Sequence, residues 1–152
     1  MTDTKPLARD PDKLRRKLID FFAGFAFYQH MGMQLLDLGP GWAHVTMNVA
    51  PVLLNPNGVL HGGALSTLID TAITQTMLMT EEFQLLRDQK QGYITTIDLR
   101  VKFLRPVKPG TIRCEARIHH MGRQVFHAMA VVTDEAGREL AQGDASYMIV
   151  RG

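Results

Sequence analysis

The segment from Leu38 to Thr80 contains only one Asp, Glu, Lys or Arg side chain, the carboxylate of Asp70. So few charges over this length indicate burial, either in a membrane or in a protein core. Prolines such as Pro51 and Pro56, together with several Asn and His side chains, exclude a membrane span, because an unpaired backbone is not tolerated there. The segment is therefore expected to form the centre of a folded domain.

Residues 62 to about 80 predict a long buried helix. Apolar or small side chains recur there at spacings of three and four, which is the period of one helix face. This predicted packing stripe consists of Leu65, Leu68, Ile69, Ala72, Ile73, Thr76 and Met79. The charged residues 81–91 are expected to continue or follow the end of this helix.

The rest of the chain predicts mainly strands. Residues 92–103 alternate apolar and polar side chains, the pattern of a strand with one buried face. Further strands are expected at 33–38, 42–49, 111–120, 124–133 and 139–150. Asp10-Pro11 is a plausible helix start, and apolar residues at helical spacing follow as far as Phe25.

Short connections favour antiparallel pairing of these strands. The pattern predicts an α+β fold in which a curved antiparallel sheet wraps one long central helix, with an extra helix at the N-terminus. At 152 residues we expect one domain, residues 10–152, preceded by a flexible tail, residues 1–9.

Composition narrows the function. A net charge of +2 is too small to indicate nucleic-acid binding, and the single cysteine, Cys114, excludes an internal disulfide framework. The N-terminus lacks the apolar stretch of a signal peptide, so we expect a cytoplasmic protein. No metal site is expected, since the histidines lack ligand spacing and adjacent His119 and His120 should point to opposite faces of a strand.

The segment Asn55–Asp70 combines two chemical features. His61-Gly62-Gly63 begins the predicted helix, where unpaired N–H groups and the helix dipole attract an oxyanion or a polarised carbonyl. Asp70 lies on the flank of the packing stripe as an isolated carboxylate. An acid beside an electrophile-binding helix start is typical of a water-activating site, although an exposed acid or a buried ion pair would also fit.

Helix geometry places Gly62 and Asp70 too far apart to act together within one chain. They are eight residues apart, or about 12 Å along a helix, whereas reacting atoms must approach to about 3 Å. If both belong to one site, Gly62 must come from a second copy of the chain. This predicts a homodimer with two shared sites about a twofold axis.

The motif Asn55-x5-His61-Gly62-Gly63-x6-Asp70 resembles that of hotdog-fold, phenylacetate-degradation-type (PaaI-like) acyl-CoA thioesterases. Further similarity covers Thr96-Ile-Asp98, Phe103-Leu-Arg-Pro106 and Gly122-Arg123. The resemblance implies an acyl-CoA substrate and no cofactor besides the CoA of the substrate itself. We expect the homodimers to pair into a dimer of dimers, but the sequence leaves the choice between dimer and tetramer open.

The resemblance also implies roles for individual residues. The Gly62 N–H would polarise the thioester carbonyl, Asp70 would act as general base or as nucleophile, and His61 would orient the loop or contact the carbonyl. Asn55 and Thr96 would orient the water. Residues near strand ends would contact CoA, namely Phe103, Arg105, Gly122 and Arg123.

Some alternatives stay open at this stage. Strand alternation puts Thr95, and not Thr96, on the apolar face of its strand, in conflict with the resemblance. A non-catalytic acyl-CoA binding domain or a hotdog enoyl-CoA hydratase are the competing functions. The preferred acyl group cannot be read from the sequence.

Overall fold

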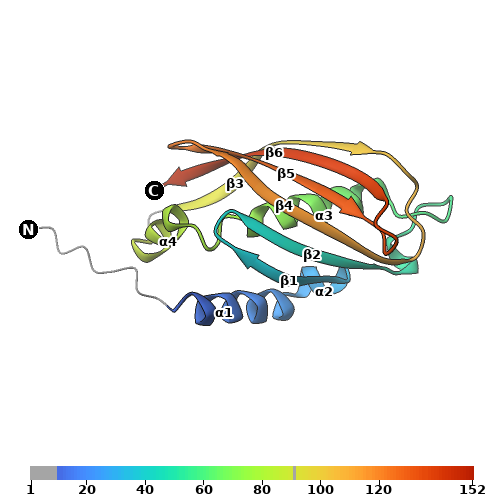
Figure 1. Cartoon of the computed structure of the whole chain (residues 1–152), viewed down its shortest axis with the longest axis horizontal. Helices are drawn as coiled ribbons and strands as arrows, with labels where there is room; N and C mark the ends of the chain where they lie inside the picture. The colour runs from blue at the N-terminus through green and yellow to red at the C-terminus, as the bar shows by residue number, and fades with distance from the viewer. Residues whose placement is uncertain (1–9, 91) are drawn as a thin grey trace, which may run out of the picture.

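A six-stranded antiparallel sheet lies across one central helix in the computed structural model, which describes residues 10–90 and 92–152 (Figure 1). The flexible tail expected at residues 1–9 lies outside the described residues. The elements are α1 (Pro11–Gly24), α2 (Ala26–His30), β1 (Met33–Gly39), β2 (Trp42–Val49), a 3-10 turn η1 (Pro51–Leu53), α3 (Gly62–Gln75), α4 (Glu81–Asp88), β3 (Gly92–Phe103), β4 (Gly110–Met121), β5 (Val125–Thr133) and β6 (Glu139–Arg151). The predicted α+β architecture is confirmed.

The strands follow the order β1-β2-β4-β5-β6-β3, and every neighbouring pair is antiparallel. Strand β3 comes directly after the helices in sequence but pairs with the last strand, β6, so it forms one edge of the sheet. In the described part of the chain the other side of β3 has no strand partner. A twelve-residue edge strand is a ready template for pairing with another chain.

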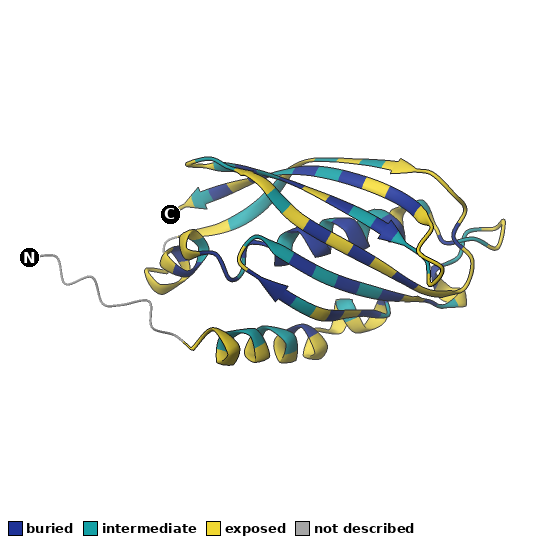
Figure 2. Ribbon diagram, in the orientation of Figure 1, coloured by how far each residue is buried: buried dark blue, intermediate teal, exposed yellow. Residues whose placement is uncertain are grey.

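The core lies between α3 and the facing side of the sheet (Figure 2). Leu68, Ile69 and Ala72 of α3 are completely buried. The helix approaches β6 so closely at Gly143 that a Cβ atom there would lie 2.5 Å from the Ile69 side chain. Any larger residue at position 143 would push α3 away from the sheet and shift the groups that α3 carries.

Helix α3 ends at Gln75, earlier than the expected end near residue 80. The Thr76 hydroxyl donates to the Ile73 carbonyl and the Thr80 hydroxyl to the Met77 carbonyl, and such side-chain bonds compete with the helical backbone pattern. Thr80 then caps α4 by accepting the Phe83 N–H. The charged segment is thus a separate helix.

The N-terminal helix begins at Pro11, capped by Asp10 as expected, because the Asp10 carboxylate accepts the backbone N–H of Asp12 at 3.1 Å. It ends at Gly24, and the short α2 follows as a separate helix that the sequence did not predict. The ring of buried Phe22 in α1 stacks on Tyr28 of α2, with 4.1 Å between ring centroids. This contact directs Tyr28 toward the interior.

Candidate functional site

Asp70 lies half-buried on α3, beside the completely buried stripe of that helix. Its Oδ1 atom accepts a hydrogen bond from the Thr96 hydroxyl of β3 at 2.8 Å. The same oxygen accepts a bond from the Tyr147 hydroxyl of β6. The structure therefore gathers an acid, a threonine and a tyrosine from three elements far apart in sequence.

Thr96 faces Asp70 because β3 contains a β-bulge. The register with β6 shifts between Thr96, which pairs with Tyr147, and Asp98, which pairs with Ser146. One extra residue, Ile97, reverses the alternation of the strand at this point. The simple alternation that favoured Thr95 is therefore wrong, and Thr96 lies on the same face as Tyr147.

Tyr147 is a site residue that the sequence analysis missed. It is 1% exposed, and its hydroxyl also lies 2.7 Å from the Asp70 carbonyl oxygen and 3.2 Å from the Thr74 hydroxyl. Burial, and then the hydrogen bond with Asp70, raise the pKa of Tyr147 above its ordinary value. A tyrosine on the buried face of a strand requires a hydrogen-bond partner, and this requirement was the available signal.

The negative charge of Asp70 also affects the pKa of a second tyrosine, Tyr28. Burial, and then the negative charge of Asp70, raise the pKa of Tyr28 in α2, while a side-chain hydrogen bond with Gln75 lowers it. Tyr28 makes no hydrogen bond to the Asp70 carboxylate among the described residues. Tyr28 therefore lies near Asp70 but does not hold its carboxylate in place.

His61 caps the start of α3. Its Nδ1 atom accepts the Gly63 N–H at 2.9 Å, so in this arrangement the ring proton is on Nε2. The Gly62 N–H has no acceptor among the hydrogen bonds of the described residues. The helix start thus presents one free donor, next to the N–H of Gly63 that His61 caps.

The side chain of Asn55 stabilises the loop that precedes α3. Its side-chain oxygen accepts the backbone N–H of Asn57 at 2.9 Å and of Val59 at 3.4 Å, the geometry of an Asx turn. Both bonds lie within the loop before α3. Within one chain the structure does not bring Asn55 to the Asp70–Thr96 pair through any hydrogen bond of the described residues.

Gly62 and Asp70 lie on the same helix, α3, as its first and ninth residues. The separation of about 12 Å along the helix axis therefore holds in the folded chain. The chain does not bring its free helix-start donor to its own carboxylate.

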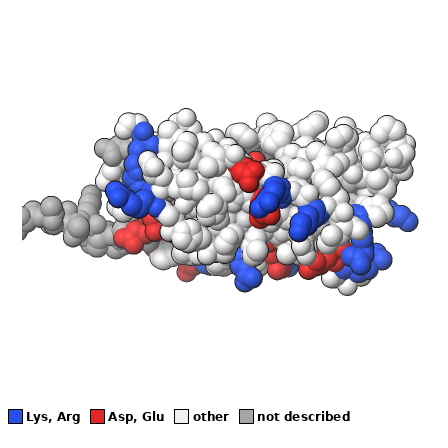
Figure 3. Space-filling model, turned by 90° about the horizontal axis from the view of Figure 1, so that it is seen from above, with Lys and Arg blue, Asp and Glu red and all other residues white. Residues whose placement is uncertain are grey.

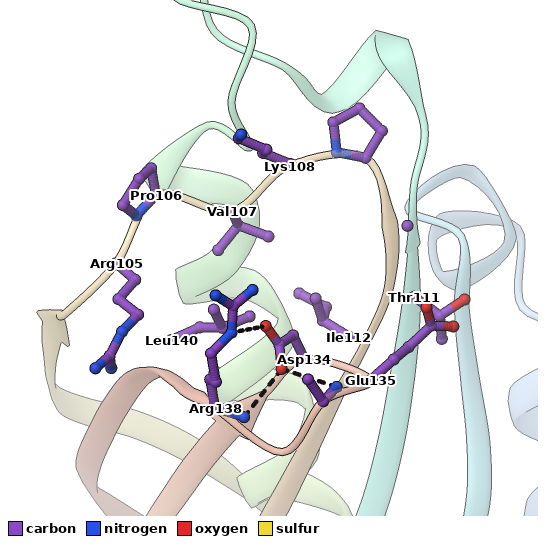
Figure 4. A pocket seen from close by; sticks show the side chains of 13 residues that line it. Arg105, Pro106, Val107, Lys108, Thr111, Ile112, Asp134, Glu135, Arg138 and Leu140 are labelled. Carbon is purple, nitrogen blue, oxygen red and sulfur yellow. Dashed lines mark hydrogen bonds and ion pairs between the residues drawn. The ribbon is translucent and has the colours of Figure 1, made fainter.

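Two hollows are lined by residues of the β3–β4 connection, and one of them also by the start of α3. Gly62, Phe103 and Arg105 line one of about 300 Å³, and the Phe103 ring lies so close that a Cβ on Gly62 would be 3.3 Å from it. Figure 4 shows the other, of about 470 Å³, between the β3–β4 connection and the β5–β6 turn. Its basic side chains are Arg105, Lys108 and Arg138.

Two of these three basic groups have partners within the chain. Arg138 is paired with Asp134 at 2.8 Å, and Arg105 donates to the Glu139 carbonyl at 2.7 Å. The backbone N–H of Arg138 lowers the pKa of Asp134, as does its guanidinium. The charge of Arg138 is therefore balanced by Asp134, whereas Arg105, which also lines the hollow beside Gly62, has only a neutral carbonyl as its partner.

Gly122 and Arg123 lie in a third hollow, of about 740 Å³, which Ile149 and Arg151 also line. Arg151 pairs with Gly92, the first residue of β3, whereas Phe103 is its last. A strand of this length spans about 36 Å. The predicted CoA contacts at Phe103 and Arg123 thus lie near opposite ends of β3.

Comparison with known proteins identifies the family. Residues 57–141, more than half of the 152-residue chain, match the thioesterase superfamily. The chain belongs to the thioesterase superfamily. The matched segment contains Gly62, Asp70 and Thr96.

Relatives support a thioester hydrolase. The proofreading thioesterase EntH of Klebsiella pneumoniae is 36% identical over 110 residues, which cover 72% of this chain and 74% of EntH. The medium/long-chain acyl-CoA thioesterase YigI of Salmonella typhimurium is 24% identical over 131 residues, covering 81% and 84% of the two chains. This thioesterase is therefore similar to two enzymes named as thioesterases, one of which is named for medium- and long-chain acyl-CoA.

Solved structures agree on the fold. The PaaI protein of the Escherichia coli phenylacetic acid degradation operon aligns with a TM-score of 0.76 at 22% identity, covering 93% of this thioesterase and 96% of PaaI. A conserved protein, PA5202 of Pseudomonas aeruginosa, aligns with a TM-score of 0.75 at 27% identity, covering 86% and 98%. The predicted hotdog fold is confirmed.

The histidines of this thioesterase are arranged differently from expectation. A bulge between Ile118 and His120 of β4 brings both His119 and His120 beside His127, with ring centroids about 6 Å apart. The expectation that they point to opposite faces is wrong. Even so, residues 10–90 and 92–152 contain no group of three or more His, Cys, Asp or Glu side chains able to hold a metal ion.

No helix in the described ranges is both long and apolar enough to cross a membrane. The long segment with a single charged side chain, noted in the sequence, supplies β2, η1 and α3. Most of its apolar side chains lie in or against the core. Its burial is thus explained by the fold.

Proposed function

We propose that this thioesterase hydrolyses acyl-CoA thioesters, with Asp70 as general base. The observation that carries the proposal is the Asp70 carboxylate held through one oxygen by Thr96 and Tyr147. The name of YigI, an acyl-CoA thioesterase, supports the CoA ester as substrate class. Hydrolysis needs only water, so the proposal includes no metal or redox cofactor, and CoA is part of the substrate.

The proposed reaction proceeds in two steps. Asp70 takes a proton from water while the water oxygen forms a bond to the thioester carbonyl carbon, and the developing oxyanion accepts the Gly62 N–H of a second chain. The C–S bond of the tetrahedral intermediate then breaks. The proton held by Asp70 passes to the departing sulfur, giving a free acid and the CoA thiol.

A homodimer is part of the proposal. Pairing of two β3 edges about a twofold axis would run the strands antiparallel, so the Phe103 end of one chain would approach the Thr96 region of the other. Tyr93, Ile97 and Phe103 of β3 are 51–61% exposed. Figure 3 looks onto the uppermost side in Figure 1, where β3 and β6 run, and large areas there carry no charge.

The same pairing supports a shared CoA site. Phe103 and Arg105 lie at one end of β3 and Arg123 at the other, so antiparallel strands would bring Arg105 of one chain toward the Arg123 end of its partner. Basic side chains at the mouth of such a site suit the phosphates of CoA. Further pairing into a dimer of dimers and a cytoplasmic location complete the proposal.

The function is tested by release of free thiol from a panel of acyl- and aryl-CoA esters. We expect wild type to release thiol and Asp70→Asn, which keeps the side-chain volume but cannot take a proton, to be slower by about 10²–10⁴-fold. Binding of a nonhydrolysable acyl-CoA should be nearly equal in both proteins.

Other outcomes would decide against the proposal. Binding without thiol release from any ester would favour an acyl-CoA binding domain, and hydration of an enoyl-CoA with its thioester intact would favour a hydratase. An Asp70→Asn protein that keeps a third of the activity would remove Asp70 from the mechanism.

A further inference from the structure

The two oxygens of the Asp70 carboxylate are held unequally. Oδ1 accepts bonds from both Thr96 and Tyr147, while no hydrogen bond or ion pair within the described ranges reaches Oδ2. We propose that Tyr147 is a positioning residue, which fixes Oδ1 together with Thr96 and leaves Oδ2 to accept the proton of water. This inference rests on the proposed function of Asp70.

The phenol of Tyr147 is itself fixed. Its ring stacks on Phe126 of β5 with 5.0 Å between centroids and 19° between planes, and both residues are almost completely buried. The Thr74 hydroxyl lies within hydrogen-bond distance of the phenol oxygen. Because ring and hydroxyl are both constrained, Tyr147 can hold the carboxylate in one orientation.

Tyr147 can only donate to Asp70 while it is protonated. Burial favours the neutral phenol, and so does the adjacent carboxylate. The phenol is therefore a donor throughout the pH range in which a carboxylate acts as a base, and a hydrogen bond to a charged acceptor is stronger than one to a neutral acceptor.

The groups around Asp70 come from four elements. They are Thr74 of α3, Thr96 of β3, Tyr147 of β6 and Tyr28 of α2. No Lys, Arg or His in the described ranges forms an ion pair with Asp70. Tyr28 provides a matched control for Tyr147. The charge of Asp70 raises its pKa, but it makes no hydrogen bond to the Asp70 carboxylate in the described ranges.

The first test compares Tyr147→Phe with Tyr28→Phe. For Tyr147→Phe we expect kcat to fall about tenfold and the acid limb of the kcat/KM profile to move up by about one pH unit, the effect of one lost charge-assisted bond. KM should change less than twofold. Tyr28→Phe should leave the acid limb in place.

A second variant reverses the direction of the effect. The chain has three tyrosines, so Tyr147 is the only one in a Tyr28→Phe/Tyr93→Phe background, where 3-fluorotyrosine can be incorporated. Fluorine makes the phenol a stronger donor with almost no change in volume, so the acid limb should move to lower pH. This variant keeps the hydroxyl and its packing, and it tests the inference even if Tyr147→Phe does not fold.

The outcomes separate this inference from the proposed function. If Asp70→Asn is inactive but neither the folded Tyr147→Phe variant nor fluorotyrosine moves the acid limb, the role of Tyr147 is wrong and Asp70 remains the base. If Asp70→Asn retains activity, the proposed function itself is wrong. Movement of the acid limb in the two opposite directions would support the inference.

Discussion

Gly62 is the first residue of α3, the helix position that tolerates proline best. The preceding residue, His61, already has the extended backbone that a following proline requires (φ −60°, ψ 132°). Gly62→Pro should therefore preserve α3 while deleting the free N–H. We expect kcat to fall by about 10²–10³-fold, the usual cost of one oxyanion donor.

The matched control is Gly62→Ala, which keeps the N–H and displaces only the exposed ring of Phe103. Its thiol release, measured alongside, should stay within a few-fold of wild type. Equal losses in the two variants would show that the added atoms, and not the missing donor, impair the enzyme.

Adjacent threonines provide a second pair of variants. Thr96→Val removes the hydroxyl that donates to Asp70, and we expect a roughly tenfold or greater loss of kcat, as for other charge-assisted bonds. Thr95→Val changes the neighbouring residue on the other face of β3 and should have little effect. A larger loss in Thr95→Val, measured by the same thiol assay, would contradict the assigned roles.

These residues mark the limits of prediction from sequence. The isolated position of Asp70 and the free helix start at Gly62 could be predicted, because charge distribution and helix chemistry are local properties. The side of β3 on which Thr96 lies could not be predicted, since a one-residue bulge reverses the alternation of a strand without a clear sequence signal. The partnership of Tyr147 with Asp70 depends on tertiary packing across 77 residues.

Among the elements, strands were predicted more closely than helices. The six expected strands agree with β1–β6 to within a residue or two, because period-two alternation is unambiguous on a sheet with one buried face. The end of α3 was placed too late, since Thr76 and Thr80 terminate it through their hydroxyls and not through a proline or glycine. The break before α2 likewise lacked a strong signal.

The β4–β5 hairpin carries Arg123 at the edge of a large hollow. If Arg123 contacts a CoA phosphate, Arg123→Ala should raise KM for acyl-CoA about three- to tenfold with kcat nearly unchanged, because such a contact binds ground and transition states alike. An acyl-pantetheine substrate, which lacks the nucleotide, should show almost no change. Equal KM changes for both substrates would exclude this phosphate contact.

On the scale of the whole molecule, one chain does not assemble the proposed site. The proposed donor at Gly62 and the proposed base at Asp70 are separated along α3, and the predicted CoA contacts are separated along β3. Helix geometry already indicated the separation of Gly62 and Asp70 from the sequence, but only the fold shows that β3 is an edge strand. A twofold pairing of these edges would resolve both separations at once.

Complementation between inactive subunits tests this shared site most directly. Asp70→Asn and Gly62→Pro proteins, each inactive alone, are mixed under conditions in which mass-tagged subunits are seen to exchange. One of the two sites in each mixed dimer would combine an intact Asp70 with an intact Gly62. Since about half of the dimers are mixed, we predict recovery of roughly a quarter of wild-type thiol release. Confirmed exchange without recovered activity would contradict a site shared between two chains.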